Sequence, residues 1–397
     1  MDQGIQRSRH LRRSDRSFSH LGGIACGLLS LSPAFACQLQ TVGVLHVEMV
    51  GNSPLVDVSI NGQPARLLID TGAAASILTR PAAQAYHLQL LALEGVTMYG
   101  VGGSDATDRV VVEGFQLGTL KVHDAQFFVA GRGIGAAAGV LGESLLSRWD
   151  AEFDFAHGAV RLFQPKGCSG DQVVYWGGSY SVSPLQDVGE GSMIKTVLEL
   201  NGHKTLAWWD SGASLSTVTT DAARLAGVVM HSDDVKETGQ VRGIGSQSVP
   251  MFITVFTTFQ VGDERIENAK LRIADMFSMN KSAPTATHIA RDQIEVPGML
   301  LGADFFHSHR IYVARSQNKV YFSYAGGPVF APHVREVQGQ QGGAEETGHG
   351  ASGQENAGGT ADQPAADQPA ADQSAADQSA GDKPGTRPGV EPGRPKG

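Results

Sequence analysis

Two stretches of the chain, 140 residues apart, share one pattern of apolar and polar positions. Residues 61–85 and 201–225 align without a gap and are identical at nine of 25 positions. In each copy a strand with one apolar face leads to an Asn-Gly pair, and a second apolar strand then ends at an aspartate. Alternation with period two is typical of strands, and Asn-Gly favours a tight type I′ hairpin. The duplication therefore predicts two mostly β lobes built alike.

Three more features occur in both halves of the chain. Each half has a glycine-rich hairpin tip, then two apolar residues and a glycine before a short helical stretch, then a closing hairpin. These features lie at 99–103 and 242–246, at 140–142 and 300–302, and at 151–163 and 311–323. Thr79 and Thr219 are expected to cap short Ala-rich helices. The second half carries about 20 extra residues, at roughly 277–297, which we interpret as a surface insertion.

The two ends of the chain differ from this duplicated middle. Residues 1–36 contain five arginines, a short apolar stretch and the sequence Ala-Phe-Ala, which together predict an export signal. Residues 331–397 are poor in apolar residues and contain a five-residue repeat, so we expect a disordered low-complexity tail. Between them we expect an N-terminal lobe at 37–165, a linker at 166–190 and a C-terminal lobe at 191–330. The chain is thus expected in the periplasm or outside the cell.

Composition and charge exclude several partners. The chain has 397 residues and a formal net charge of −9, without a stripe of Lys and Arg that could neutralise phosphates, so nucleic acid is not expected as a partner. No apolar run reaches the roughly 18 residues that a membrane-spanning helix needs. We expect no integral membrane span.

The cysteines leave three alternatives open. Cys26 falls inside the predicted signal, so only Cys37 and Cys168 remain. They could form one disulfide in an oxidising compartment, remain as two thiols, or leave Cys37 as the site of a lipid anchor directly after the signal. Two cysteines are too few for a Cys-based zinc site.

The two aspartates at the strand ends are the candidate chemical groups. Asp70 and Asp210 lie in matching D-T-G-A and D-S-G-A loops, where Gly72 and Gly212 allow a tight turn. If the lobes associate about a pseudo-dyad, the two carboxyl groups meet and share one proton. Such a pair can activate a water molecule for attack on a peptide carbonyl without a metal, a cofactor or a covalent intermediate.

The sequence here resembles a bacterial, single-chain, two-lobe version of the retropepsin-like aspartic proteases. The two D-[TS]-G-A loops, the glycine-rich tips and the apolar-apolar-Gly segments carry this resemblance over about 44–325. It implies an all-β, bilobal, pseudo-two-fold fold in which each lobe is a small closed β-barrel with one or two short helices. It also implies a monomer that hydrolyses protein or peptide substrates. The roles that it implies are catalysis by Asp70 and Asp210, support by Thr71, Gly72, Ser211 and Gly212, and flaps that contact the substrate at Tyr99, Gly100, Gly102, Gly243 and Gly245.

The chain also departs from the family pattern. Viral members pair an Asp after D-T-G-A with an Arg after the later glycine, whereas this chain has Ala74 with Glu143, and the second half lacks that pair as well. Ser144 stands where the second half has Asp304. Because Ala73 and Ala213 replace the hydroxyl residues of pepsin-like members, we expect activity at mildly acidic to neutral pH. The bulky Trp208 and Trp209 are expected to narrow the cleft.

Other readings of the sequence remain as alternatives. A protease-like module without activity that binds peptide or cell-envelope material is the main rival, and an intracellular homodimeric protease with one unused repeat is another. Residues 131–136 superficially match a dinucleotide fingerprint but are interpreted as a loop. His307 and His309 could bind a metal, although we interpret the stretch 307–309 as surface residues.

Overall fold

A computed structural model describes residues 37–100, 103–131, 133–186, 193–241, 248–277 and 296–331. The predicted signal, the tail after residue 331 and most of the predicted insertion at 277–297 lie outside the described residues. The described residues belong to one structural unit of the chain.

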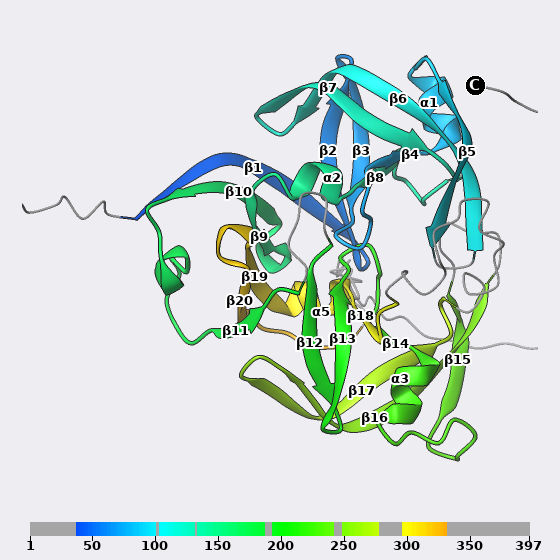
Figure 1. Cartoon of the computed structure of the whole chain (residues 1–397), viewed down its shortest axis with the longest axis vertical. Coiled ribbons are helices and arrows are strands. Elements are labelled where there is room, and N and C mark those ends of the chain that lie inside the picture. The colour runs from blue at the N-terminus through cyan, green and yellow to red at the C-terminus, as the bar shows by residue number, and fades with distance from the viewer. Residues whose placement is uncertain are drawn as a thin grey trace, which may run out of the picture. The chain divides into compact units, whose positions relative to one another are not determined.

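Each half of the duplication closes into a six-stranded barrel (Figure 1). The hydrogen-bonded order of strands is the same in both barrels. It begins with the two strands of the Asn-Gly hairpin, continues with the apolar-apolar-Gly strand and a two-residue strand, and ends with a long hairpin whose last strand pairs with the first strand of the barrel. The first barrel runs through β2 (Ser53–Ile60), β3 (Gln63–Ile69), β8 (Gly139–Leu141), β4 (Ile77–Leu78), β7 (Leu120–Val129) and β6 (Gly103–Leu117). The second runs through β12 (Lys195–Leu200), β13 (His203–Trp209), β18 (Met299–Leu301), β14 (Thr217–Val218), β17 (Glu264–Ala274) and β16 (Val249–Val261).

Short elements complete both barrels. An extra strand lies beside the long hairpin of each lobe, and each lobe has two short α-helices among the described residues. The strands are β5 (Leu91–Gly100) and β15 (Lys236–Val241), and the helices are α1 (Arg80–Ala85) and α2 (Glu143–Leu146) in the first lobe and α3 (Thr220–Leu225) and α5 (Ala303–Ser308) in the second. The prediction of an all-β fold of two closed barrels is confirmed.

The local signals of the sequence account for the repeated turns and helix starts. Asn61 and Gly62 have φ values of 50° and 84°, and Asn201 and Gly202 have 51° and 79°, as a type I′ turn requires. Thr79 accepts a hydrogen bond from the Ala82 amide at the start of α1, and Thr219 does the same for α3. Both capping predictions are confirmed.

A six-stranded sheet joins the two lobes. Its order is β11 (Ser181–Pro184), β20 (Lys319–Tyr324), β19 (His309–Ala314), β9 (Asp150–Asp154), β10 (Ala159–Lys166) and β1 (Gln38–Val50). The predicted closing hairpins are β9–β10 and β19–β20, and they pair with each other along β9 and β19, where Ile311 faces Phe153. Each hairpin turns through a 3₁₀ segment: η1 (Phe155–His157) connects β9 to β10, and η4 (Arg315–Gln317) connects β19 to β20. The lobes therefore share a continuous sheet as well as a common sequence pattern.

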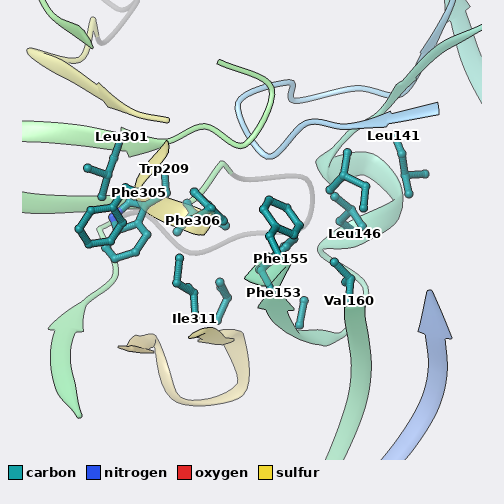
Figure 2. Packing of buried hydrophobic residues seen from close by; sticks show 14 of the residues in the cluster. Leu141, Leu146, Phe153, Phe155, Val160, Trp209, Leu301, Phe305, Phe306 and Ile311 are labelled. Atoms are coloured by element: carbon teal, nitrogen blue, oxygen red, sulfur yellow. The ribbon is translucent and has the colours of Figure 1, made fainter. Parts of the chain in front are cut away.

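Aromatic side chains fill the space above this joining sheet (Figure 2). Phe155 of the first half stacks on Phe306 of the second with ring centroids 5.6 Å apart, and Phe306 also meets Trp209 at 6.2 Å. Trp209 is fully buried, and its indole N–H donates to Thr196 Oγ1 at 2.8 Å. The expectation that Trp209 narrows the cleft is therefore wrong, because this side chain points into the core of the second barrel.

The stretch 307–309 is another correction. Ser308 and His309 are buried rather than on the surface. The His309 ring stacks on Phe305 with centroids 3.9 Å apart, and its Nε2 lies 2.9 Å from Glu264 Oε1. His309 begins a strand of the joining sheet, and strand alternation places its ring among the core aromatics.

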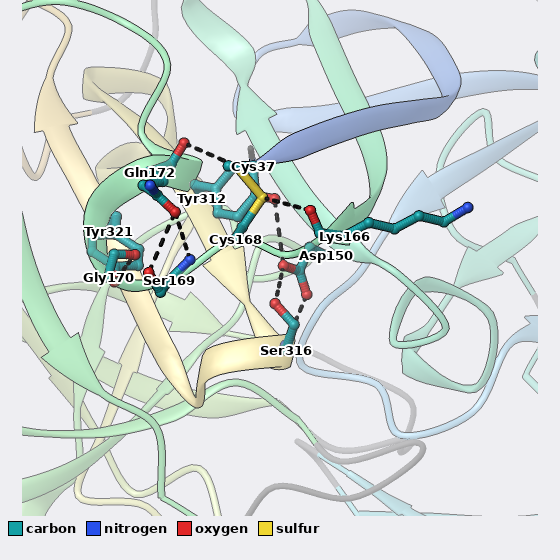
Figure 3. Close-up of a disulfide and its surroundings, with 10 residues drawn as sticks. All are labelled: Cys37, Asp150, Lys166, Cys168, Ser169, Gly170, Gln172, Tyr312, Ser316 and Tyr321. Atoms are coloured by element: carbon teal, nitrogen blue, oxygen red, sulfur yellow. Dashed lines mark hydrogen bonds between the residues drawn. A yellow bond between two sulfur atoms is a disulfide. The ribbon is translucent and has the colours of Figure 1, made fainter. Parts of the chain in front are cut away.

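A disulfide links Cys37 to Cys168 (Figure 3). It connects the start of β1 to the segment after β10, which continues into the 3₁₀ turn η2 (Gly170–Val173) and β11. That segment packs Val173 and Trp176 over Phe163 and Tyr312 on the joining sheet. Of the three alternatives for the cysteines, the structure has the disulfide, and a sulfur so bonded carries no lipid. Among the described residues, no helix is long and apolar enough to cross a membrane.

Candidate catalytic dyad

The backbone of each candidate aspartate is held by the apolar-apolar-Gly segment of its own lobe. β3 and β8 run parallel up to Ile69 and Leu141, and the Asp70 amide continues the ladder by donating to the Leu141 carbonyl at 3.0 Å. In the second lobe, the Asp210 amide donates to the Leu301 carbonyl at 2.8 Å. The two sequence features that repeat together in each half thus meet at the aspartate.

The two aspartates come together where the lobes meet. The carboxyl groups of Asp70 and Asp210 interact by a hydrogen bond, and each also faces the glycine of the opposite loop. A Cβ atom added to Gly72 would overlap the Asp210 carboxyl group, and one added to Gly212 would overlap that of Asp70. Both glycines are therefore required for the close approach of the two loops.

Backbone amides solvate the carboxylates from within their own loops. The Gly72 amide donates to Asp70 Oδ1 at 3.0 Å, and the Gly212 amide donates to Asp210 Oδ1 at 3.0 Å. The Ala213 amide donates to the same oxygen of Asp210, also at 3.0 Å. These donors orient one oxygen of each carboxyl group and lower the cost of its negative charge.

The hydroxyl residues after the aspartates bond across the pseudo-dyad. Thr71 Oγ1 accepts from the Ser211 amide at 3.0 Å and donates to the Trp209 carbonyl at 2.6 Å. In the same way, Ser211 Oγ accepts from the Thr71 amide at 3.1 Å and donates to the Ile69 carbonyl at 2.8 Å. Both side chains are fully buried. Four reciprocal hydrogen bonds thus fasten each loop to the strand of the opposite lobe.

Burial and proximity change the protonation of the pair. Burial raises the pKa of Asp70 well above its ordinary value, and the neighbouring charge of Asp210 raises it further. Burial also raises the pKa of Asp210, against the lowering effect of the Ala213 amide. Since two carboxylates in contact resist double ionisation, the pair retains one shared proton to higher pH than two isolated aspartates would.

Comparisons with known families point to the same two loops. A family model described as "gag-polyprotein putative aspartyl protease" matches residues 56–148, and one described as "Aspartyl protease" matches residues 196–305. Each match contains one of the two aspartates and most of one barrel. The chain belongs to the retropepsin-like aspartic protease family. A search of curated proteins finds no relative that matches the chain significantly.

The two protease lobes brace their aspartate loops with different side chains. Ser76 Oγ accepts from the Gly142 amide at 3.0 Å, and Ser216 Oγ accepts from the Gly302 amide at 2.8 Å. The Ser76 amide donates to Ser144 Oγ at 2.9 Å, whereas the Ser216 amide donates to the buried carboxylate of Asp304 at 2.8 Å. Ser144 thus takes the place of the acidic residue with a single hydroxyl.

An ion pair that the sequence pattern did not predict crosses between the halves of this protease. Glu143, at the start of α2, is 1% exposed, and its Oε2 lies 2.6 Å from Arg315 Nη2 on η4. The Glu143 amide also donates to the Ala73 carbonyl of the Asp70 loop at 2.9 Å. Burial raises the pKa of Glu143 to about 7 even though Arg315 lowers it. No local signal marks Arg315, because its partner is 172 positions away.

Asn52 is a second contact that the sequence did not indicate. It precedes β2, and its side-chain amide donates to the Ser214 carbonyl of the Asp210 loop at 2.7 Å. The first lobe thus holds the second loop through Asn52, and the second half holds the first loop through Arg315 and Glu143.

The predicted flap residues are only partly described. Tyr99 and Gly100 end β5, where Tyr99 pairs with Ser104 and Gly100 with Gly103 in a β5–β6 hairpin. Gly102, Gly243 and Gly245 lie outside the described residues. The position of the first hairpin tip therefore agrees with the prediction, and the flap role of all five residues stays a prediction.

Two of the alternatives, a dinucleotide site and a metal site, have no matching geometry in the described part of the chain. Residues 133–138 form a turn closed by the Ile134–Ala137 bridge and lead into β8, not into the helix that a dinucleotide site needs. No group of three or more His, Cys, Asp or Glu among the described residues could hold a metal ion.

Proposed function

We propose that this protein is an aspartic endopeptidase that hydrolyses peptide bonds of extended polypeptides through water activated by Asp70 and Asp210. The observation that carries the proposal is the contact between two partly buried carboxyl groups, one from each lobe, whose pKa values are both raised. Two aspartates without a joint role would not be expected to lie partly buried against each other, because desolvating both carboxyl groups costs free energy.

The mechanism follows from one proton shared by two carboxyl groups. The ionised member accepts a proton from a water molecule as that water attacks the substrate carbonyl. The protonated member donates a hydrogen bond to the developing oxyanion. Thr71 and Ser211 hold the loops in register so that both carboxyl groups address the same carbonyl carbon. No metal or cofactor takes part in these steps.

The substrate is expected to bind as an extended strand. Hairpins such as β5–β6 offer main-chain donors and acceptors to a peptide that lies along them, with its side chains alternating between the two lobes. Because one chain supplies both halves of the dyad, the active form is proposed to be a monomer.

Peptide hydrolysis by the purified protein tests this proposal. We expect it to cleave members of a mixed peptide library between pH 4 and pH 8, and a statine-containing peptide, which mimics the tetrahedral intermediate, should block cleavage. Asp124→Asn is a suitable control for the aspartate variants because Asp124 is exposed and has a φ of 53°, which asparagine tolerates. Binding of peptides without any cleavage would instead favour an inactive peptide-binding or cell-envelope-binding module.

We also propose that the protein acts after export, in the periplasm or outside the cell. The basic and apolar residues of 1–36 support this, and a disulfide persists mainly in oxidising compartments. Expression in a bacterial host followed by fractionation and N-terminal sequencing tests it. We expect an exported chain that begins at Cys37 and has no free thiol, and a cytoplasmic chain with an intact N-terminus would contradict the proposal.

A further inference from the structure

One row of side chains crosses the outer face of each barrel beside its catalytic loop. Strand register defines the rows, since residues paired across neighbouring strands point to the same face. The first row, in order across β2, β3, β8, β4 and β7, is Leu55, Leu68, Val140, Ile77 and Phe128. The second row, across β12, β13, β18, β14 and β17, is Lys195, Trp208, Leu300, Thr217 and Arg272.

Both rows adjoin the dyad. Along β13, Trp209 points into the barrel core, so Trp208 points to the opposite face, where it packs with Leu300 and Ala213. Ala213 is the residue whose amide binds Asp210. In the first lobe, Ala73 packs against the corresponding cluster. Substrate side chains next to the bond at the dyad must therefore lie against these two rows.

The two rows differ in chemistry at their ends. All five side chains of the first row are apolar, whereas the second row begins and ends with a cation. Lys195 is 8% exposed, and its Nζ lies 5.9 Å from the Trp208 ring centroid. Arg272 is 9% exposed and occupies the position that Phe128 holds in the first row. Of these two equivalent rows, only the one in the second lobe carries positive charge.

Arg272 lacks a full set of hydrogen-bond acceptors. Its Nη1 is buried and has no partner in the described part of the chain. Asp304 is the carboxylate whose charge acts on it. Asp304 Oδ1 accepts hydrogen bonds from Ser216 and from the Phe305 amide, whereas its Oδ2, like Arg272 Nη1, is buried and makes no hydrogen bond in the described part of the chain. A buried guanidinium donor without an acceptor costs free energy, and arginine cannot lose its proton to avoid that cost. An acceptor supplied by a ligand would remove the cost.

We propose, on the basis of the proposed protease function, that Arg272 determines specificity by binding an acidic substrate side chain in the second lobe, while the first row accepts an apolar one. A carboxylate is the side-chain group that best matches a guanidinium, because the hydrogen bonds are charge-assisted and can be bidentate. Lys195 adds positive charge to the same row. The two sides of the dyad thus select different substrate side chains, an apolar one in the first lobe and an acidic one in the second.

The main rival is a purely structural role, in which Arg272 only offsets the buried charge of Asp304. Both roles predict that loss of Arg272 lowers stability. Only the specificity role predicts that Arg272 changes the ratio of affinities for a Glu peptide and its Gln isostere, because a structural defect would weaken both peptides equally.

Binding of statine-containing peptides to the purified protein separates the two roles. The peptides carry Glu, Gln or Leu in turn at each position flanking the statine, and dissociation constants are measured by calorimetry at pH 6. At one position we expect wild-type protein to bind Glu at least about tenfold more tightly than Gln, as a charge-assisted hydrogen bond implies. Arg272→Gln should abolish this ratio, and Arg272→Lys should keep part of it. Arg265→Leu, a change at the exposed end of the same strand, should keep all of it.

Two results would overturn the inference. One is a wild-type protein with no preference for Glu over Gln at any position, a result that requires no variant to fold. The other is a Glu preference that Arg272→Gln leaves unchanged. Failure of the proposed function is distinguishable, since it appears as absence of cleavage of every library peptide while the binding ratios still report on Arg272.

Discussion

The two lobes of this protease are nearly identical at the dyad and dissimilar around it. Each places an aspartate after a buried strand, binds its carboxylate with a glycine amide and fastens the loop to the other lobe by a hydroxyl. The side chains that support the two loops differ. Ser144 braces the first loop, and the equivalent residue in the second lobe is Asp304. Glu143 and Arg315 form an ion pair, whereas the equivalent positions in the other half are Ala303 and Phe155. The duplication has kept what both carboxyl groups require in common, and it has let the supporting side chains diverge.

The difference shows which contacts symmetry requires. A shared proton needs two carboxyl groups within hydrogen-bonding distance of each other, and the attack needs both within reach of one carbonyl, so the loop geometry must match on both sides. The bracing of each loop must only hold it in place, and a hydroxyl, a carboxylate or an ion pair can each do so. A peptide substrate is not symmetric about the cleaved bond. Lobe surfaces that differ in chemistry can therefore bind the different side chains on its two sides.

Outside the aspartates themselves, the largest expected effect comes from the glycines that the lobes share. Gly72→Ala and Gly212→Ala should each lower kcat/KM by about 100-fold or more, because the new methyl group must displace the opposite carboxyl group. The effects should be similar in the two lobes. Steady-state kinetics on a cleaved library peptide measures this, with Gly177→Ala as a control because a Cβ there meets no neighbour within 4 Å and the residue has no positive φ. A large effect in one lobe alone would show that the loops are not equivalent.

The free energy of unfolding should depend more strongly on Asp304, which supports the second loop, than on Ser144, which supports the first. Asp304→Ser should cost about 2–3 kcal/mol of unfolding free energy, since a buried carboxylate accepts hydrogen bonds from Ser216 and Phe305. Ser144→Ala should cost only about 1 kcal/mol, because one neutral acceptor is lost. Chemical denaturation gives both values. Equal costs would contradict the view that the lobes are braced differently.

The pH dependence of stability should be a smaller and asymmetric effect. Burial raises the pKa of Glu143 to about 7 and that of Asp304 to about 6, so the folded protein holds these protons more tightly than the unfolded chain does. Their contribution to stability is then fully present below about pH 4.5, the ordinary range of such carboxyls, and is lost as pH rises through about 6 to 7. We expect the melting temperature to fall between pH 5 and pH 8.

Glu143→Gln provides the matching control for this prediction. The variant has no titrating group at that position, so it should show a smaller fall in melting temperature over the same range than the parent protein. A parent protein that becomes more stable towards pH 8, or a variant with an unchanged pH profile, would contradict the assignment to Glu143.

The sequence predicted the parts of this structure that depend on local chemistry. The Asn-Gly turns, the threonine caps and the closing hairpins follow from backbone preferences within a few residues. The duplication then indicated that Asp70 and Asp210 occupy equivalent places. Strand alternation along β13 also implies that Trp208 and Trp209 point to opposite faces. The expectation that both residues narrow the cleft did not take this alternation into account.

The remaining features depend on contacts between distant segments. The pairing of β9 with β19, the Glu143–Arg315 ion pair and the Asn52 contact to Ser214 join residues more than 150 positions apart. No residue in these contacts is unusual in its local context. The burial of His309 follows from the same joining sheet, which a single sequence does not reveal.

The central claim is that Asp70 and Asp210 act as one unit that holds one shared proton. The most direct test is a comparison of kcat/KM for Asp70→Asn, Asp210→Asn and the double variant on one library peptide, with Asp124→Asn as control. The account predicts that each single change lowers kcat/KM by about a thousandfold or more and that the double change lowers it little further, since residues acting as a unit are not additive. Substantial activity in either single variant would contradict it.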